Sequence, residues 1–214
     1  MKKKVILAIG AHPDDIEIGC GGSIRSFALQ DADIFFIVAT LGEKCNVRNI
    51  EEKLLFDKRQ GESINAAKYL GVKEVFFLGL PDTNLEQNGT TVDAIEKYVK
   101  LLNPDFIFTH TKEDNHQDHR NLALATISAC RRQKINILHY EAPSTAQSFL
   151  PVVFNDITST INYKIETLGI FTTQNEKIYL DKEAIKGLAK YRGYISGYEY
   201  AEGFEVTKYY LKNL

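Results

Sequence analysis

The chain has 214 residues, of which 44% are hydrophobic and 25% are charged, which is typical of one globular domain with a sizeable core, so we expect a single domain over residues 1–214. The formal net charge of −2 gives no electrostatic reason to expect a nucleic acid or an anionic membrane as a partner. No stretch approaches the roughly 18 consecutive apolar residues that a membrane-spanning helix requires.

The first predicted element is a buried strand over residues 5–10, because the run Val-Ile-Leu-Ala-Ile-Gly is short and continuously apolar. Three lysines precede this run, so the start of the chain superficially resembles a signal peptide. The apolar run is too short for one, and it ends in a polar cluster without a small-residue cleavage site. We therefore interpret it as the first strand of the fold.

Potential metal ligands follow this strand directly, in the sequence Ala11-His12-Pro13-Asp14-Asp15. Ligands of open α/β sheets bind beyond the carboxyl ends of the strands. His12 and Asp15 lie three residues apart, a spacing that puts both on one face if Asp15 begins a helical turn. The alternative is that His12 is a hydrogen-bonded turn residue and that the aspartates cap the next helix.

Strands and helices then alternate along the chain. We expect helices over residues 23–30, 51–70, 92–102, 122–127 and 181–194, and further strands over residues 34–39, 75–78, 106–110 and 135–140. Gly71 and Asn103-Pro104 are typical helix stops, and Asp181 is the expected cap of the last helix. We expect the glycines of residues 19–22 to let the backbone turn tightly behind the first polar cluster.

This alternation predicts the fold class. It indicates right-handed βαβ units and therefore an α/β fold, with a Rossmann-like, mainly parallel sheet, helices on both faces and the active site at the carboxyl ends of the strands. The pattern weakens between residues 143 and 180, where prolines and a Ser/Thr-rich stretch interrupt it.

A second polar cluster, Glu113 to Arg120, follows the predicted strand over residues 106–110 and contains His116, Asp118 and His119. If both strands belong to one parallel sheet, the two clusters meet at the same edge. Two histidines and one carboxylate with an open fourth position are typical of a catalytic zinc site. His110 and His139, in contrast, lie in or at the ends of apolar strands, and we expect them to be hydrogen-bonded core or rim residues.

The three cysteines, Cys20, Cys45 and Cys130, are widely spaced and odd in number. This pattern indicates neither a disulfide framework nor a structural zinc site. A reducing, cytoplasmic location is therefore expected.

The two clusters together, His12-Pro13-Asp14-Asp15 and His116-Gln117-Asp118-His119, resemble a known family. They are similar to the zinc-dependent sugar de-N-acetylases related to N-acetylglucosaminyl-phosphatidylinositol deacetylase, the LmbE-like group, which includes the deacetylases of bacillithiol and mycothiol synthesis. Further similarity lies in residues 40–43, 59–62, 78–82 and 200–204. The resemblance spans most of the chain, although residues 143–195 carry little of it.

The resemblance implies roles for the clustered residues. It implies that His12, Asp15 and His119 are the zinc ligands, and that Asp14 is the general base acting on the attacking water. His116 would then stabilise the oxyanion or protonate the leaving amine. We expect Asp118 to hold His116 in its protonated form, the alternative being that Asp118 only caps the following helix.

Substrate contacts are also implied by the resemblance. Arg59 resembles the family's sugar-binding arginine, Asp82 its partner for sugar hydroxyls, and Glu43 lies in a loop that approaches the site. The alternative for Arg59 is a helix-surface arginine that meets Glu62. The polar loops over residues 42–49 and 82–91 are long enough to shape a pocket.

The implied function is a zinc-dependent hydrolase that removes an N-acetyl group from an N-acetylglucosamine-like conjugate, releasing acetate and a free amine. Two alternatives stay open at this point: a deacylase of a non-sugar amide or thiol conjugate, and a non-enzymatic metal- or sugar-binding protein, which would leave Asp14 and His116 without a role. The same ligand set also suits Fe²⁺ or another divalent metal. The expected partner is a small acetylated conjugate, and the sequence leaves a homo-oligomer open.

Overall fold

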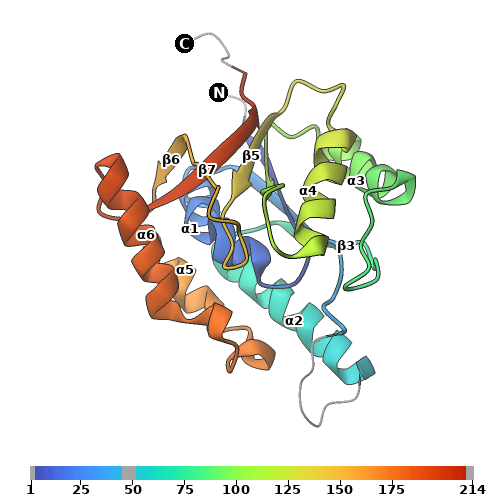
Figure 1. The fold of residues 1–214 in the computed structure, drawn as a ribbon, viewed down its shortest axis with the longest axis horizontal. Helices are drawn as coiled ribbons and strands as arrows, with labels where there is room; N and C mark the ends of the chain where they lie inside the picture. The colour runs from blue at the N-terminus through green and yellow to red at the C-terminus, as the bar shows by residue number, and fades with distance from the viewer. Residues whose placement is uncertain (1–2, 45–51, 211–214) are drawn as a thin grey trace.

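The computed structural model describes residues 3–44 and 52–210, and the strands in these ranges form one mixed sheet flanked by helices (Figure 1). The strands are β1 (Val5–Gly10), β2 (Asp33–Val38), β3 (Glu74–Phe77), β4 (Phe106–His110), β5 (Asn136–Tyr140), β6 (Val153–Asp156) and β7 (Ala201–Lys208). The helices are α1 (Asp15–Leu29), α2 (Glu52–Leu70), α3 (Gly89–Leu102), α4 (Gln117–Ala129), α5 (Ile161–Leu168) and α6 (Lys182–Ser196), with short 3₁₀ turns η1 (Thr172–Gln174) and η2 (Ile178–Leu180).

The sheet has the order β3-β2-β1-β4-β5-β7-β6. Strands β1 to β5 pair in parallel, while β7 is antiparallel to both β5 and β6. The predicted α/β class with a mainly parallel sheet is therefore confirmed. Strands β6 and β7 and helix α5 were not predicted, because the stretch that contains most of them lacks a regular apolar period.

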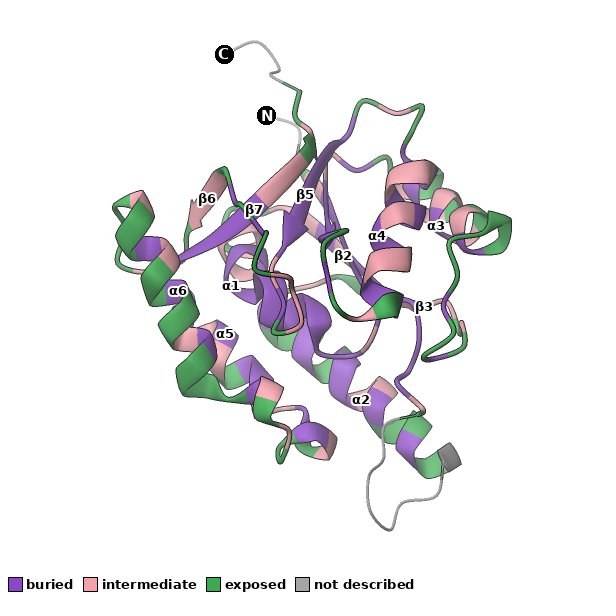
Figure 2. Ribbon diagram, viewed as in Figure 1, coloured by how far each residue is buried: buried purple, intermediate pink, exposed green. Residues whose placement is uncertain are grey.

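Alternating residues of the central strands supply two separate cores. Leu7 and Ile9 of β1 pack with apolar residues of α3 and α4, whereas Ile6 and Ala8 face the opposite side and pack with α1 and α2. The strand period of two directs successive side chains to opposite faces of the sheet. Figure 2 shows the central strands almost entirely buried. Helices on both faces are thus confirmed.

Helix α1 differs from the expectation at its glycines. It begins at Asp15 and runs through residues 19–22, so these glycines do not form a turn behind the polar cluster, as we had expected. The helix is instead kinked at Cys20, which has φ −143° and ψ 19°. A Cβ atom on Gly19 would lie 2.1 Å from Cδ2 of Tyr140, so the absence of a side chain lets α1 lie directly against β5.

The kink in α1 is stabilised from β7. The carboxylate of Glu202 accepts the backbone N–H groups of Gly22 and Ser23 at 3.0 and 2.7 Å. The kink opens a new helix start, and these donors would otherwise lack partners. Lys164 of α5 pairs with the same carboxylate at 2.5 Å. Glu202, which lies within residues 200–204 at the start of β7, thus links this strand to α1 and α5.

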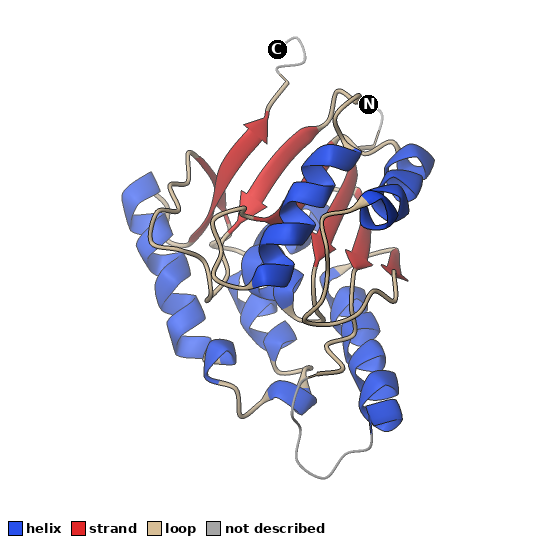
Figure 3. Cartoon of the chain, turned by 45° about the vertical axis from the view of Figure 1, so that its right-hand side comes forward, coloured by secondary structure: helices blue, strands red, loops and turns tan. Residues whose placement is uncertain are grey.

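The strand order reverses between β1 and β4, which are neighbours in the sheet. Loops that follow such strands diverge to opposite sides and leave a crevice, where open α/β sheets bind ligands. Figure 3 shows the parallel strands ending at one edge of the sheet, with the loops gathered there. Both polar clusters lie at this edge.

The thiols of Cys20 and Cys130 are buried and free, whereas Cys45 lies outside the described residues. Across the two described ranges, the helices lack the length and apolar character that crossing a membrane requires.

We predict that Gly19→Ala lowers the free energy of unfolding by about 1–3 kcal/mol, because the added methyl group overpacks the buried ring of Tyr140. Urea denaturation measures this change. Gly61→Ala is the matched control: Gly61 lies inside α2 and its Cβ would meet nothing within 4 Å. This control should gain roughly 0.5–1 kcal/mol. Equal effects of the two substitutions would contradict the packing argument.

Candidate active site

The loops after β1 and β4 bring His12, Asp15 and His119 together. One ligand atom from each of the three lies within 4.8 Å of the others. His12 Nδ1 is 3.3 Å from one oxygen of Asp15, and His119 Nε2 is 3.4 Å from the other. Two imidazole nitrogens and one carboxylate around a common point are a donor set that fits a divalent metal with an open coordination position.

The outer nitrogen of each histidine is held by carboxylates. His12 Nε2 lies 3.1 Å from Asp82 and 3.3 Å from Asp118, while His119 Nδ1 lies 3.3 Å from Asp114. Metal-ligating histidines almost always donate their second N–H in this way, which fixes the tautomer and the ring orientation. Here it directs His12 Nδ1 and His119 Nε2 to the common point. The residues present therefore fit a metal centre.

Charges at this centre are balanced between the histidines and the carboxylates. Burial lowers the pKa of His119, but the Asp15 and Asp114 carboxylates outweigh burial and raise it to about 9. Burial raises the pKa of Asp15, but His119 and His110 hold it well below its usual range. A cation must displace the histidine protons to bind, so metal affinity should rise with pH.

Asp14 lies beside the donor set in a different environment. Its backbone has φ 100°, a left-handed conformation that is costly for a residue with a side chain. The carboxylate is 3% exposed, and its Oδ2 has no hydrogen-bond partner among the described residues. Arg59 Nη2 lies 3.9 Å from that oxygen. Burial raises the pKa of Asp14 to about 7, although Arg59 opposes the shift.

His116 begins helix α4 and lies against the centre. Its Nδ1 accepts the backbone N–H of Asp118 at 3.2 Å, so in the neutral ring the proton is on Nε2. The ring centroid is 4.5 Å from that of His119 and 4.9 Å from that of His12. Burial and the two neighbouring histidines lower the pKa of His116.

The carboxylate of Asp118 raises the pKa of His116, as expected, but burial, His119 and His12 outweigh this effect and the net shift is downward. Asp118 accepts the backbone N–H groups of Thr83 at 2.8 Å and Leu85 at 3.3 Å, besides meeting His12. The prediction that Asp118 holds His116 in its protonated form was therefore wrong. The capping alternative was also wrong, because the side chain that caps α4 is that of His116. Asp118 instead connects a predicted ligand to the loop after β3.

Arg59 is buried rather than on a helix surface. It is 3% exposed, and its guanidinium donates to the carbonyl oxygens of Pro13 at 3.2 Å and Gly42 at 3.4 Å. Glu62, the expected partner in the surface interpretation, accepts hydrogen bonds from residues 172 and 173 instead. The surface alternative is therefore wrong.

Asp82 lies next to His12, whereas Glu43 contacts Asp82 and lies farther from the histidines. Asp82 bonds His12 with one oxygen and accepts the Lys44 N–H at 2.9 Å with the other. Glu43 accepts the backbone N–H of Asp82 at 2.8 Å and so supports this residue from behind. It lines a neighbouring surface hollow rather than the cavity at the centre. Of the polar loop predicted over residues 42–49, residues 45–49 lie outside the described residues.

Sequence reasoning missed the residues behind His119. The His110 ring stacks on it with a centroid distance of 3.8 Å, and His110 Nε2 is 3.1 Å from Asp15. Asp114 and Ser144 contact Nδ1 of His119, the outer nitrogen of that ring. His139, as expected, is hydrogen-bonded at both ring nitrogens. Asp114 belongs to the second polar cluster, and this position was the sequence signal that could have identified it as a partner of His119.

A cavity of about 290 Å³, the reaction cavity, is lined by the three grouped residues His12, Asp15 and His119 and by Asp14 and His116. Its other lining residues include polar ones, Arg59, Lys44, Asp82 and Thr83, which we call the polar wall, and apolar ones, Ile18, Pro143 and Tyr179, which we call the apolar wall.

Comparisons with known proteins agree with this geometry. The family model described as "PIG-L: GlcNAc-PI de-N-acetylase" matches residues 7–130, which include both polar clusters. The uncharacterized deacetylase YaiS of Escherichia coli (strain K12) is 38% identical over 162 residues, 73% of this chain and 83% of that protein. A probable N-acetyl-alpha-D-glucosaminyl L-malate deacetylase 2 of Bacillus cereus is 27% identical over 194 residues, 84% of this chain and 87% of that protein.

A solved structure shares the fold. GalB of Pseudomonas putida KT2440, a 4-carboxy-2-hydroxymuconate hydratase, has a TM-score of 0.86 and 21% identity, with 99% of each chain covered. This likeness concerns the fold alone, because one fold supports different reactions. The match to the family model, together with the 38% identity to a deacetylase over most of both chains, carries the assignment: this chain belongs to the GlcNAc-PI de-N-acetylase (PIG-L) family of deacetylases.

Proposed function

We propose that this protein removes the N-acetyl group from an N-acetylglucosamine-like conjugate and releases acetate and a free amine. The names of the family and of its relatives support an acetylated amino sugar as substrate. The observation that carries the proposal is the contrast between two neighbouring carboxylates. Asp15 is engaged by His110, His12 and His119, whereas Asp14 is buried beside the same point and its Oδ2 has no hydrogen-bond partner in the part of the chain that the structure describes.

We assign the metal ligands to His12, Asp15 and His119, and Zn²⁺ is the ion that this donor set favours, with Fe²⁺ as the main competitor. When bound, such an ion polarises the amide carbonyl and lowers the pKa of water. Metal analysis of protein purified without added zinc distinguishes the two ions.

Asp14 serves as the general base in this proposal. Its pKa near 7 lets it be deprotonated and still accept a proton at neutral pH. It takes one proton from the attacking water while the water oxygen bonds to the carbonyl carbon. When the C–N bond breaks, the same proton passes to the leaving amine. His116 contributes its Nε2–H as a hydrogen-bond donor to the oxyanion.

The polar wall binds the sugar in this proposal. Arg59 has a buried Nε–H without a hydrogen-bond partner among the described residues, and Asp82 and Thr83 line the same cavity with polar groups. Buried donors and acceptors of this kind are satisfied when sugar hydroxyls bind. Asp118 and Glu43 position this wall through Thr83, Leu85 and Asp82.

Acetate release from a panel of compounds tests the substrate class. The panel contains N-acetylglucosamine, its glycosides, N-acetyl amino acids and S-acetyl thiols. Release from the sugars alone supports the proposal. Release from the amino acids or thiols alone favours the non-sugar deacylase, and no release with metal present favours a binding protein.

We predict that His12→Ala and His119→Ala each lose metal and activity together. Two remaining protein ligands do not hold a labile ion well in an open site. Metal content by mass spectrometry and acetate release are measured on the same samples. His139→Ala is the control, because His139 is buried but lies outside the reaction cavity. Full metal occupancy in the His12 and His119 variants would remove these residues from the ligand set.

We predict that Asp14→Asn retains nearly stoichiometric metal while kcat falls by roughly 10² to 10⁴, the usual contribution of a positioned base. Asp15→Asn should instead weaken metal binding, because Asp15 is part of the donor set. The two aspartates are adjacent, so each variant controls for the other. Loss of metal from Asp14→Asn, or unchanged turnover, would require a different base.

We predict that Arg59→Ala raises KM by about tenfold with metal content unchanged, which corresponds to losing one charge-assisted hydrogen bond to the substrate. Arg131→Ala is the matched control, since Arg131 is exposed on the surface. Steady-state kinetics on the best substrate of the panel give both values. An unchanged KM in Arg59→Ala would mean that Arg59 does not contact the substrate and only holds the backbone at Pro13 and Gly42.

A further inference from the structure

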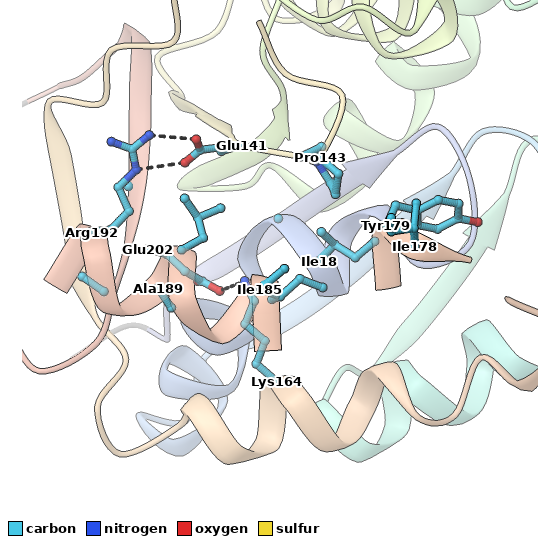
Figure 4. Close-up of a pocket in the computed structure, with 16 residues that line it drawn as sticks. Ile18, Glu141, Pro143, Lys164, Ile178, Tyr179, Ile185, Ala189, Arg192 and Glu202 are labelled. Atoms are coloured by element: carbon cyan, nitrogen blue, oxygen red, sulfur yellow. Dashed lines mark hydrogen bonds and ion pairs between the residues drawn. The ribbon is translucent and has the colours of Figure 1, made fainter. Parts of the chain in front are cut away.

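A second cavity, of about 170 Å³, lies beside the reaction cavity, and we call it the apolar cavity (Figure 4). Most of its lining residues are apolar or glycine, and they come from α1, α6, β7, η2 and the segment after β5. Nothing in the function proposed so far uses this space.

The four charged residues in the wall of the apolar cavity neutralise each other. Arg192 donates to Glu141 through two nitrogens, at 2.9 and 2.8 Å, and Lys164 pairs with Glu202 at 2.5 Å. Figure 4 shows the two members of each pair joined by dashed lines. Because each charge has an opposite partner, the cavity favours an apolar group over an ion.

The two cavities share part of their wall. Ile18, Pro143 and Tyr179 line both. Ile18 donates its backbone N–H to the carbonyl oxygen of Asp14 at 2.9 Å. Pro143 precedes Ser144, which bonds His119 Nδ1 at 3.2 Å. The apolar cavity therefore begins immediately next to the group of residues to which we assign the chemistry.

The lining of the reaction cavity offers two kinds of surface. In the proposed function Arg59, Asp82 and Thr83 meet the sugar, which leaves Ile18, Pro143 and Tyr179 for the acyl group. We propose that the apolar cavity is an acyl subsite and that the enzyme hydrolyses N-acyl glucosamines with chains longer than acetyl more efficiently than N-acetylglucosamine. This inference rests on the proposed function. The water oxygen adds to the carbonyl carbon, the C–N bond breaks, and a fatty carboxylate and the free amine are released.

The size of the cavity sets the expected chain length. A dry apolar cavity of about 150 Å³ binds benzene, so the present cavity suits roughly six carbons. Its rim is also apolar, since Leu188 is 38% and Ile178 is 91% exposed. Exposed apolar side chains at a cavity mouth are typical of sites that bind apolar ligands.

The test compares N-acetyl- and N-hexanoylglucosamine, which differ only in the acyl chain. We expect kcat/KM of the wild-type enzyme to be about tenfold or more higher for the hexanoyl compound, since each methylene in an apolar pocket contributes to binding. Ala189→Leu fills the apolar cavity and should abolish this preference, while N-acetylglucosamine hydrolysis stays unchanged. Ala94→Leu on α3, which lines neither cavity, is the matched control.

A second variant guards against misfolding of Ala189→Leu. Leu188→Ala removes an exposed apolar side chain from the rim and should lower kcat/KM for the hexanoyl compound alone, by about threefold or more.

Equal wild-type kcat/KM for the two compounds, or an Ala189→Leu enzyme that folds and retains the preference, would overturn the acyl subsite and leave the proposed function intact. A preference for hexyl N-acetylglucosaminide over the hexanoyl amide would move the subsite to the aglycone and also overturn it. Hydrolysis of none of these compounds would reject the proposed function itself.

Discussion

The hydrogen bonds between carboxylates and the outer nitrogens of His12 and His119 are the interactions on which the site depends. They fix two rings from different loops so that one nitrogen of each faces the same point. The same carboxylates bind the surrounding backbone: Asp118 accepts N–H groups of the loop after β3, and Asp114 accepts that of His116. Loops after β1, β3 and β4 are thereby held in one arrangement, at the point where the strand order reverses.

Two adjacent aspartates acquire different properties from their surroundings. Asp15 begins α1 and is surrounded by three histidines, which favour its charged form. Asp14 precedes the helix in a left-handed conformation, and its carboxylate is buried. Burial disfavours the charged form more than Arg59, His12 and His119 favour it, so its pKa rises. Differently placed carboxylates commonly divide the roles of ligand and base, and the backbone strain at Asp14 is consistent with a functional constraint.

The last third of the chain extends the parallel sheet and adds a second space to the site. Glu202 of β7 stabilises the kink in α1 and pairs with Lys164 of α5, so the C-terminal elements are fixed to the helix that begins at Asp15. The same contacts form one wall of the apolar cavity. A structural connection between α1 and β7 therefore also shapes the space next to the proposed reaction centre.

Local patterns in the sequence were enough to predict the parallel sheet, the helices on both faces, and the two polar clusters after β1 and β4, because strand periodicity and the position of polar residues after apolar runs are local signals. The sequence also directed attention to His12, Asp14, Asp15 and His119 through their resemblance to a family. Helix α1 began earlier than expected, because Ile16, Ile18 and Cys20 alternate with polar or glycine residues in its first turns and so lack the apolar period of a helix. Three features can be seen only in the folded chain: Asp118 bonds His12, Arg59 is buried, and Glu202 caps a kink 180 residues away in the sequence. These contacts join distant segments, and their geometry depends on how loops and helices pack, which no local pattern of residues encodes.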